Sequence, residues 1–287
     1  MDATLLALID LGIIDQATAE IITRNSSPVE LRTYVERKLL DAFQRGLIRQ
    51  QSTLLEMVRE GDEPDAAFWR EEDRRLWQSV ADDVREVATE TGATFAIRGG
   101  DVSMWQRVDE SLIAWVERYY TSLDPYDYGS MAALNATTAE QFKDAYIRWQ
   151  RGEIAYSQGE GLPALINEVA PIFGPNRART IAITEGTRII AESRQAAAMA
   201  NDAVTHMRLF TAADELVCPT CGPLHNQVRP KAQRYYVHPT LGQIEGPPFH
   251  VRCRCDETEE TAAMLAVSSL NRAPYEFVGE LPEKTSK

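Results

Sequence analysis

The chain has 287 residues, of which 44% are hydrophobic and 25% charged, and residues 1–150 alone hold 27 Asp and Glu against 16 Lys and Arg. The composition is ordinary for a soluble globular protein, and no apolar run approaches the ~20 residues that span a bilayer, so we expect a cytoplasmic protein with no membrane partner. The acidic first half would be repelled by phosphate backbones, which disfavours broad DNA binding; it could face a basic protein partner or serve solubility alone.

The first two hundred residues are predicted to be helical. Residues 27–30, Ser-Pro-Val-Glu, form a capping box with proline at the first helical position, and they open a helix to about Glu60. Further helices are expected over about 65–91 and 102–122, where apolar residues recur every three to four positions. Long tryptophan, tyrosine and arginine side chains on these helices favour an elongated, partner-contacting region over a tight four-helix core.

Three more helices are expected before the chain changes character. Residues 137–140, Thr-Thr-Ala-Glu, form a second capping box that should open a helix to about Arg151. A short helix over 162–169 should end before Pro171, because proline disrupts a helix interior. The last long helix is predicted from about 176 to 201.

A small lobe with β-structure is predicted from about residue 206. Residues 207–212 alternate like a strand, 234–237 form a second β-prone run, and glycines and prolines supply turns between them. About sixty residues bury too little apolar surface for a stable domain, and a bound metal ion commonly supplies the missing stability. From Asp256 the chain is expected to continue as an acidic tail, with a short helix near 260–270.

All four cysteines lie in this lobe, whereas cysteines acting as small hydrophobes would scatter along the chain. Cys218 and Cys221 form a C-x2-C pair, and after a loop of 28 residues come His250, Cys253 and Cys255. In a cytoplasm, such pairs indicate a metal more often than a disulfide.

Zinc binds four ligands in a tetrahedron, and four protein ligands leave no open position, so we expect a structural site and not a catalytic one. The preferred set is Cys218, Cys221, His250 and Cys253, since both halves then have two-residue spacing. Three alternatives stay open: Cys255 as a competing ligand, His225 in place of His250, or reduced thiols with no metal. The predicted fold class is mainly α, an elongated helical N-terminal region followed by a small α+β zinc-organised C-terminal lobe.

The order of motifs over roughly residues 140–258 is similar to one protein family. A helix carries Arg177-Ala-x-x-Ile-Ala-x-Thr-Glu185, a strand ends in Thr-Ala-Ala-Asp214, and then come Val217-Cys-Pro-Thr-Cys-Gly-Pro-Leu-His-Asn226 and Phe249-His-x-x-Cys-Arg-Cys255. This resembles the Mu F-like minor head, or head morphogenesis, proteins of tailed bacteriophages.

The chain departs from the family pattern at three places. Val251 stands where the family usually has Pro, Ile183 where it has Arg, and His225-Asn226 where it often has Asp-Gly. Asn tolerates the left-handed backbone that Gly would supply, so we expect that turn to survive. The change at Ile183 puts in doubt any role of that position in charge pairing.

The resemblance implies a non-enzymatic protein that joins the phage head near the portal vertex. It implies the portal protein as partner, and scaffold or major capsid protein as further candidates. It also implies residence in the virion after assembly in the host cytoplasm. The domain division that goes with it is a helical region over 1–135, a head morphogenesis domain over 136–258 with a zinc lobe at about 206–258, and an acidic C-terminal tail over 259–287.

Thr184 and Glu185 end the helix motif quoted above, and we assign them a physical role. We predict that Glu185 accepts hydrogen bonds from the metal lobe, with Arg254 as the donor, and so fastens the helix to the lobe. The alternative is an ordinary surface pair worth a few tenths of a kcal/mol.

Two other function classes compete with the head protein. A zinc-stabilised nuclease or toxin-like enzyme would need several further histidines and an acidic residue at a catalytic ion, and the chain has only four histidines. A DNA-contacting module is the other, but residues 151–255 hold only 11 basic against 9 acidic side chains. Contact with packaged DNA would therefore be local and sensitive to salt. The basic residues considered for it are Arg177, Arg179, Arg188, Arg194, Arg208, Arg229, Lys231, Arg234, Arg252 and Arg254.

Overall fold

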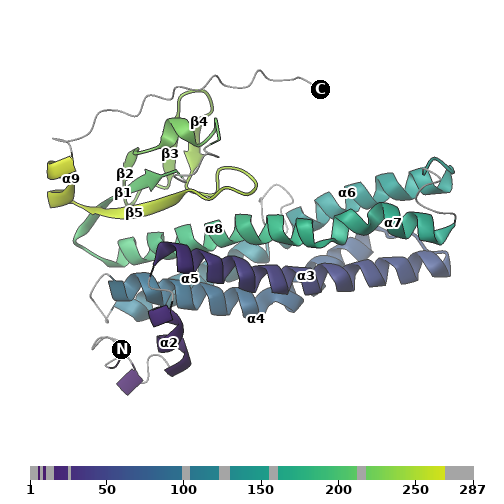
Figure 1. Ribbon diagram of the computed structural model, residues 1–287, viewed down its shortest axis with the longest axis horizontal. Helices are drawn as coiled ribbons and strands as arrows, with labels where there is room; N and C mark the ends of the chain where they lie inside the picture. The colour runs from purple at the N-terminus through teal and green to yellow at the C-terminus, as the bar shows by residue number, and fades with distance from the viewer. Residues whose placement is uncertain are drawn as a thin grey trace. The chain divides into compact units, whose positions relative to one another are not determined.

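The computed structural model describes residues 6, 9–10, 16–24, 27–98, 104–122, 130–154, 161–211 and 218–268 (Figure 1). The predicted fold class is confirmed, because a mostly helical chain is followed by a small antiparallel sheet lobe with a cluster of cysteine and histidine. The helices are α2 (Gln16–Arg24), α3 (Pro28–Glu60), α4 (Ala66–Arg98), α5 (Trp105–Tyr120), α6 (Met131–Gln150), α7 (Leu162–Phe173), α8 (Pro175–Ala200) and α9 (Ala262–Ser268). The strands are β1 (Val204–Phe210), β2 (Val228–Pro230), β3 (Tyr235–His238), β4 (Gly242–Glu245) and β5 (Asp256–Thr261).

The chain forms two compact units. One, the helical unit, consists of residues 33–87 and 113–182. The other, the sheet-bearing unit, consists of residues 1–32, 88–112 and 183–287. The sequence-based division at 135 and 258 is drawn on motifs, and it stays a prediction.

The start of α3 follows the predicted capping box. The backbone N–H of Glu30 donates to Ser27 Oγ at 3.1 Å, and the backbone N–H of Ser27 donates to the Glu30 carboxylate at 3.0 Å. Each bond satisfies a backbone donor that the first helical turn leaves free.

The second predicted capping box is wrong as a helix start. α6 begins at Met131, with the buried Ser130 as N-cap, whose Oγ accepts the backbone N–H of Ala133 at 3.1 Å. Thr137 and Thr138 lie nearly two turns further on, inside the helix, where their hydroxyls donate to carbonyls four residues back. A threonine can satisfy its hydroxyl in either setting, so the Thr-Thr-Ala-Glu pattern alone did not decide between them.

The predicted end of the short helix is also wrong, since α7 continues through Pro171 to Phe173. Arg177, half-buried near the start of α8, caps this end of the helix, because its guanidinium donates to the Ile172 carbonyl at 3.0 Å. The same side chain donates to the Leu134 carbonyl at 3.0 Å and to Thr138 Oγ1 at 2.7 Å. Desolvation lowers the pKa of Arg177 to about 10, and these acceptors compensate the buried charge. The first residue of the family-like motif therefore ties α6, α7 and α8 together within the helical unit.

The core of the helical unit depends on a close approach of α3 and α4. A Cβ added at Gly46 would lie 2.7 Å from Leu76 Cδ1 and 2.9 Å from Ser79 Oγ. The Trp77 and Tyr120 rings stack with centroids 5.4 Å apart. Buried apolar residues of α3, α4 and α5 in this unit include Leu39, Phe43, Leu47, Leu76, Val80, Val84 and Val116.

Gly46→Val is expected to lower the stability of the helical unit by about 1–3 kcal/mol, because the two branch methyls overpack the α3–α4 contact. Thermal unfolding followed by far-UV circular dichroism measures the effect. Ser52→Val, at an exposed position of the same helix, is the matched control. Equal melting temperatures for the two variants would contradict the tight packing at Gly46.

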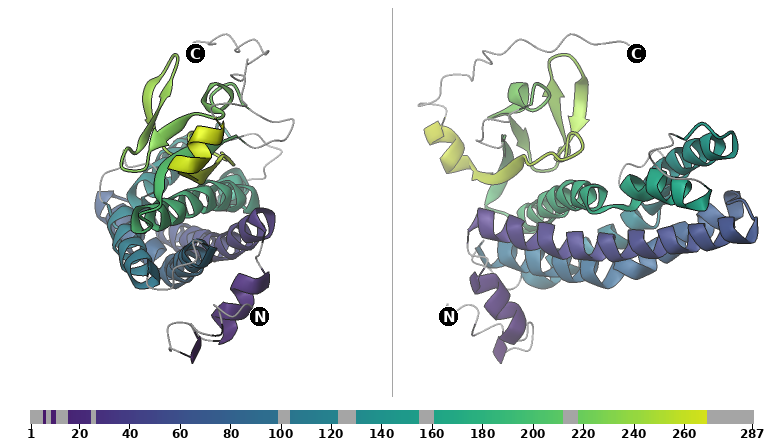
Figure 2. Two further views of the ribbon diagram at one scale, coloured as in Figure 1. Left: turned by 90° about the vertical axis from the view of Figure 1, so that its left-hand side faces the viewer. Right: turned by 45° about the vertical axis from the view of Figure 1, so that its right-hand side comes forward.

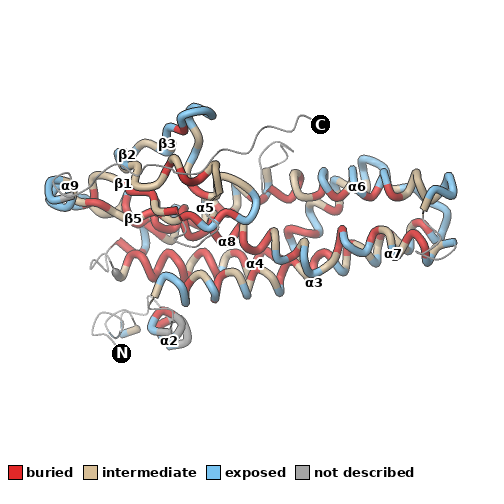
Figure 3. Tube along the Cα trace, turned by 45° about the horizontal axis from the view of Figure 1, so that its top comes forward, coloured by how far each residue is buried: buried red, intermediate tan, exposed pale blue. Residues whose placement is uncertain are grey.

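The sheet of the sheet-bearing unit has three antiparallel strands in the order β2-β1-β5, with Met207 opposite both Arg229 and Glu259. The hairpin β3–β4 forms a separate two-stranded sheet (Figures 1 and 2), and Arg234, just before β3, pairs with Glu192 of α8. Most of the residues from 183 to 200 in α8 are buried (Figure 3).

The prediction of an acidic tail from Asp256 onward is wrong for the first six residues, which form the strand β5. The carboxylates of this strand pair with arginines: Asp256 with Arg194 at 3.0 Å, Glu257 with Arg229 at 2.7 Å, and Glu260 with Arg208 at 2.5 Å. A run of acidic residues is typical of a solvent-exposed tail. In this protein each of these three carboxylates pairs with an arginine from α8, β1 or β2.

Candidate metal centre

Cys218 and Cys221 lie in one tight turn that leads into the short helix Gly222–Leu224. The Cys218 carbonyl accepts the backbone N–H groups of Cys221 and Gly222, both at 3.0 Å. The N–H of Cys221 also approaches Cys218 Sγ at 3.3 Å. Two residues between the cysteines are enough for this turn, and it places both sulfurs on the same side.

The other three candidate ligands come from the loop between β4 and β5. The backbone N–H of Cys253 donates to the His250 carbonyl at 3.1 Å, which closes a second turn. Cys255 directly precedes β5. None of the four cysteines forms a disulfide, and Cys221, Cys253 and Cys255 are buried.

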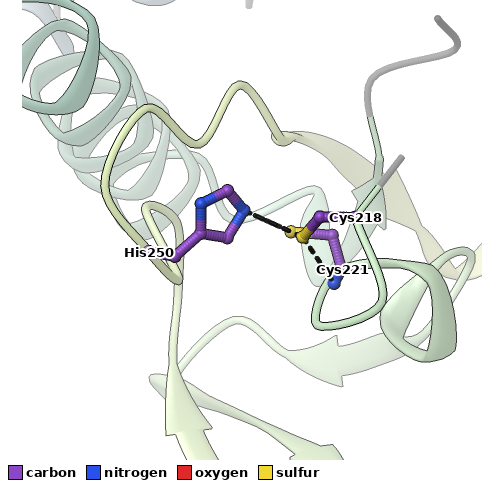
Figure 4. Close-up of side chains that lie close together, drawn as sticks. All are labelled: Cys218, Cys221 and His250. Atoms are coloured by element: carbon purple, nitrogen blue, oxygen red, sulfur yellow. Dashed lines mark hydrogen bonds between the residues drawn. The ribbon is translucent and has the colours of Figure 1, made fainter. Parts of the chain in front are cut away.

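The side chains from the two turns meet (Figure 4). His250 Nε2 lies 3.0 Å from Cys218 Sγ and 3.2 Å from Cys221 Sγ, and Cys221 Sγ lies 3.9 Å from Cys253 Sγ. Around a tetrahedral zinc with its usual bond lengths, neighbouring ligand atoms are about 3.5–3.8 Å apart. The two nitrogen–sulfur separations are shorter than this and the sulfur–sulfur separation is slightly longer, so Cys218, Cys221 and His250 lie close enough to share a cation, while Cys253 clusters with Cys221 and Cys255.

The orientation of His250 suits a metal ligand. Its Nδ1 lies 2.8 Å from the Val251 carbonyl, to which it can only donate, and this turns Nε2 toward the sulfurs. Metal-binding histidines are typically fixed by such a hydrogen bond from the other ring nitrogen. The neighbouring Cys253 sulfur raises the pKa of His250 to about 9. A bound cation would have to displace that proton, so metal affinity should fall as the pH is lowered.

Cys255 belongs to a second group that shares Cys221. The ligand atoms of Cys218, Cys221 and His250 all lie within 4.8 Å of one another, and so do those of Cys221, Cys253 and Cys255. The geometry therefore brings together five donors for four positions. His250 and Cys255 compete for the last of them, and the choice between them stays a prediction.

Helix α8 contacts the second turn through its threonines. Thr184 Oγ1 accepts the backbone N–H of Arg252 at 2.9 Å, and Thr187 Oγ1 donates to the Cys253 carbonyl at 2.6 Å. Glu185 is only 2% exposed, and its carboxylate lies 3.6 Å from Arg188 Nε. The predicted bond from Arg254 to Glu185 stays a prediction. Thr187 was missed in the sequence, since a helical threonine carries no signal of a distant carbonyl.

The remaining histidines have other contacts. His225 Nδ1 accepts the backbone N–H of Thr211 at 3.2 Å, and His225 is in neither group of clustered donors. His238 is the predicted turn residue: its Nδ1 accepts the backbone N–H groups of Thr240 and Leu241, both at 3.1 Å. Asn226 has a φ of 64°, so the left-handed backbone expected there is confirmed.

Sulfur and imidazole donors from two turns, with no further carboxylate or histidine in either group, can hold a borderline cation. A cation held by donors from both turns would cross-link the two loops. No helix in the parts of the chain that the structure describes is both long and apolar enough to cross a membrane.

Part of the chain matches a known protein family. Residues 132–258 match the family described as phage Mu protein F like protein, a range that runs from α6 into β5 and contains all five clustered donors. The resemblance read from the motifs is thereby confirmed. No match was found among curated proteins or among solved structures.

Proposed function

Because residues 132–258 belong to the phage Mu F-like family, we propose that this protein is a non-enzymatic minor head protein of a tailed bacteriophage. It would act in head morphogenesis near the portal vertex and remain in the virion. Its partners would be the portal protein, and scaffold or major capsid protein beside it. The observation that carries the proposal is the family match together with a Cys and His cluster inside the matched range.

We further propose that Cys218, Cys221, His250 and Cys253 hold a structural zinc ion. The ion would join the C-x2-C turn to the β4–β5 loop and so complete a lobe with few apolar residues of its own. Its buried cluster consists of Leu209, Cys221, Leu224, Tyr236, Cys253 and Cys255, so half of that core is cysteine.

The contacts of the basic residues argue against DNA binding as the main function. Most of the basic side chains considered for it are engaged within the protein, with carboxylates or with backbone carbonyls. These are Arg177, Arg188, Arg194, Arg208, Arg229, Lys231 and Arg234. A cation already paired with a carboxylate releases few counterions on binding phosphate, so its contribution to DNA affinity is small.

An amber mutation in the gene of the encoding phage tests the proposal. Under non-suppressing conditions we expect particles with defective heads and a large loss of infectious titre, restored by the wild-type gene on a plasmid. Mass spectrometry of purified heads should detect the protein. Normal titre without the protein would contradict the assignment. The enzyme alternative predicts nicking of supercoiled DNA by the purified chain with Mg2+, Mn2+ or Zn2+, and we expect none.

A further inference from the structure

The carbonyl of Cys253 is held by a relay of hydrogen bonds from two helices. Thr187 is 1% exposed, and its hydroxyl donates to that carbonyl at 2.6 Å. The same hydroxyl oxygen accepts a hydrogen bond from Arg32 Nη1 at 2.8 Å. Arg32 lies in the first turns of α3 and Thr187 in α8, so residues distant in sequence converge on one peptide group.

A second threonine, Thr184, bonds to the backbone directly before Cys253. Thr184 Oγ1 accepts the backbone N–H of Arg252 at 2.9 Å. Arg252 has a φ of 62°, a left-handed conformation that a residue with a side chain seldom adopts. Thr184 and Thr187 are three residues apart, so they lie on one face of α8.

We propose that Thr184, Thr187 and Arg32 form a hydroxyl clamp that positions Cys253 for metal binding and slows release of the metal. Thr184 fixes the N–H before the ligand, and Thr187 fixes the carbonyl of the ligand itself. Arg32 holds the Thr187 hydroxyl so that its proton points to the carbonyl. This inference rests on the proposed metal site and names residues that set its retention.

The clamp sets the position of the Cys253 sulfur, and it does not decide whether Cys253 can bind the metal at all. A cysteine displaced by a fraction of an ångström still binds metal, but with a longer bond or a distorted tetrahedron. Partners that orient a ligand without touching the metal typically change metal affinity by about 10–100-fold. Because the Cys253 carbonyl is buried with its residue, losing the Thr187 hydroxyl also leaves it without this donor, which favours opening of the turn.

The test compares metal release from the full-length chain loaded with Zn2+, with a chromogenic chelator in excess. Thr187→Val keeps the side-chain shape and removes the hydroxyl, and it should accelerate release about 10–100-fold. Thr187→Ser restores the hydroxyl and should restore a rate near that of the wild type. Thr180→Val, also in α8, is the matched control, because its hydroxyl donates to the Asn176 carbonyl four residues back in the same helix.

Loading with Co2+ gives a readout that a general loss of stability would not move. The visible d–d bands should shift or broaden in Thr187→Val and stay unchanged in Thr180→Val, because only the first distorts the ligand sphere. Arg32→Met keeps the bond from Thr187 to Cys253 and should accelerate release less than Thr187→Val does.

The outcomes separate the clamp from the site. If Thr187→Val releases zinc at the rate of Thr180→Val, with an unchanged cobalt spectrum, the clamp is refuted and the metal site stands. If the wild-type chain retains no metal after dialysis, the proposed zinc site is refuted, and the clamp falls with it.

Discussion

Cys221→Ser is expected to abolish tight metal binding and to unfold the lobe around the cysteine cluster. Cys221 is the donor shared by both groups of clustered ligands, so its loss leaves only two donors in each group. Structural zinc sites contribute about 10–16 kcal/mol of apparent binding free energy in small zinc domains at neutral pH. Elemental analysis should show the metal content fall from one ion per chain to none, and near-UV circular dichroism should lose the signal of Tyr236 and its neighbours.

Cys255→Ser and His250→Ala are the matched variants that decide the ligand set. With Cys218, Cys221, His250 and Cys253 as ligands, Cys255→Ser keeps one metal ion per chain and His250→Ala loses most of its affinity. The reverse result would establish the four-cysteine site. If all three variants and the wild type are alike in metal content and in thiol reactivity, the cluster is a group of reduced thiols and the zinc proposal is wrong.

Local signals in the sequence predicted the helices whose ends depend on nearby residues. The capping box at Ser27 places the start of α3 because both of its hydrogen bonds are made within four residues. The similar pattern at Thr137 failed, because the start of α6 is decided by Ser130, which is buried and carries the cap itself. A helix start is predictable where the cap is local and the competing cap is absent.

The parts missed in the sequence depend on partners far along the chain. β5 has no apolar alternation, and its carboxylates become strand residues only because Arg194, Arg208 and Arg229 reach them. Thr187 contacts a carbonyl 66 residues away. The cysteines and His250 were found because metal ligands are few in kind and their spacing reports a turn. A hydroxyl that positions a ligand has no such spacing.

The ion pairs of β5 also lead to a prediction of a large effect at Glu257, which is 1% exposed. Its Oε1 accepts from Arg229 Nη2 at 2.7 Å, from Arg229 Nε at 3.1 Å and from the Tyr236 hydroxyl at 2.5 Å. Burial raises the pKa of the Tyr236 phenol, which keeps it protonated as a donor. Burial also raises the pKa of the Glu257 carboxyl, and the Arg229 guanidinium opposes that shift.

Glu257→Leu should therefore destabilise the sheet-bearing unit by about 3–5 kcal/mol, because it leaves the buried Arg229 without its carboxylate. Arg229→Met combined with Glu257→Leu removes both charges and should recover much of that loss, since buried pairs replaced by apolar residues are often close to neutral. Glu259→Gln, in the same strand but with a side chain 30% exposed, is the control and should cost under about 1 kcal/mol. Urea unfolding measures all three. A double variant as unstable as Glu257→Leu alone would show that β5 needs its charges for more than mutual compensation, and that they specify its place beside β1.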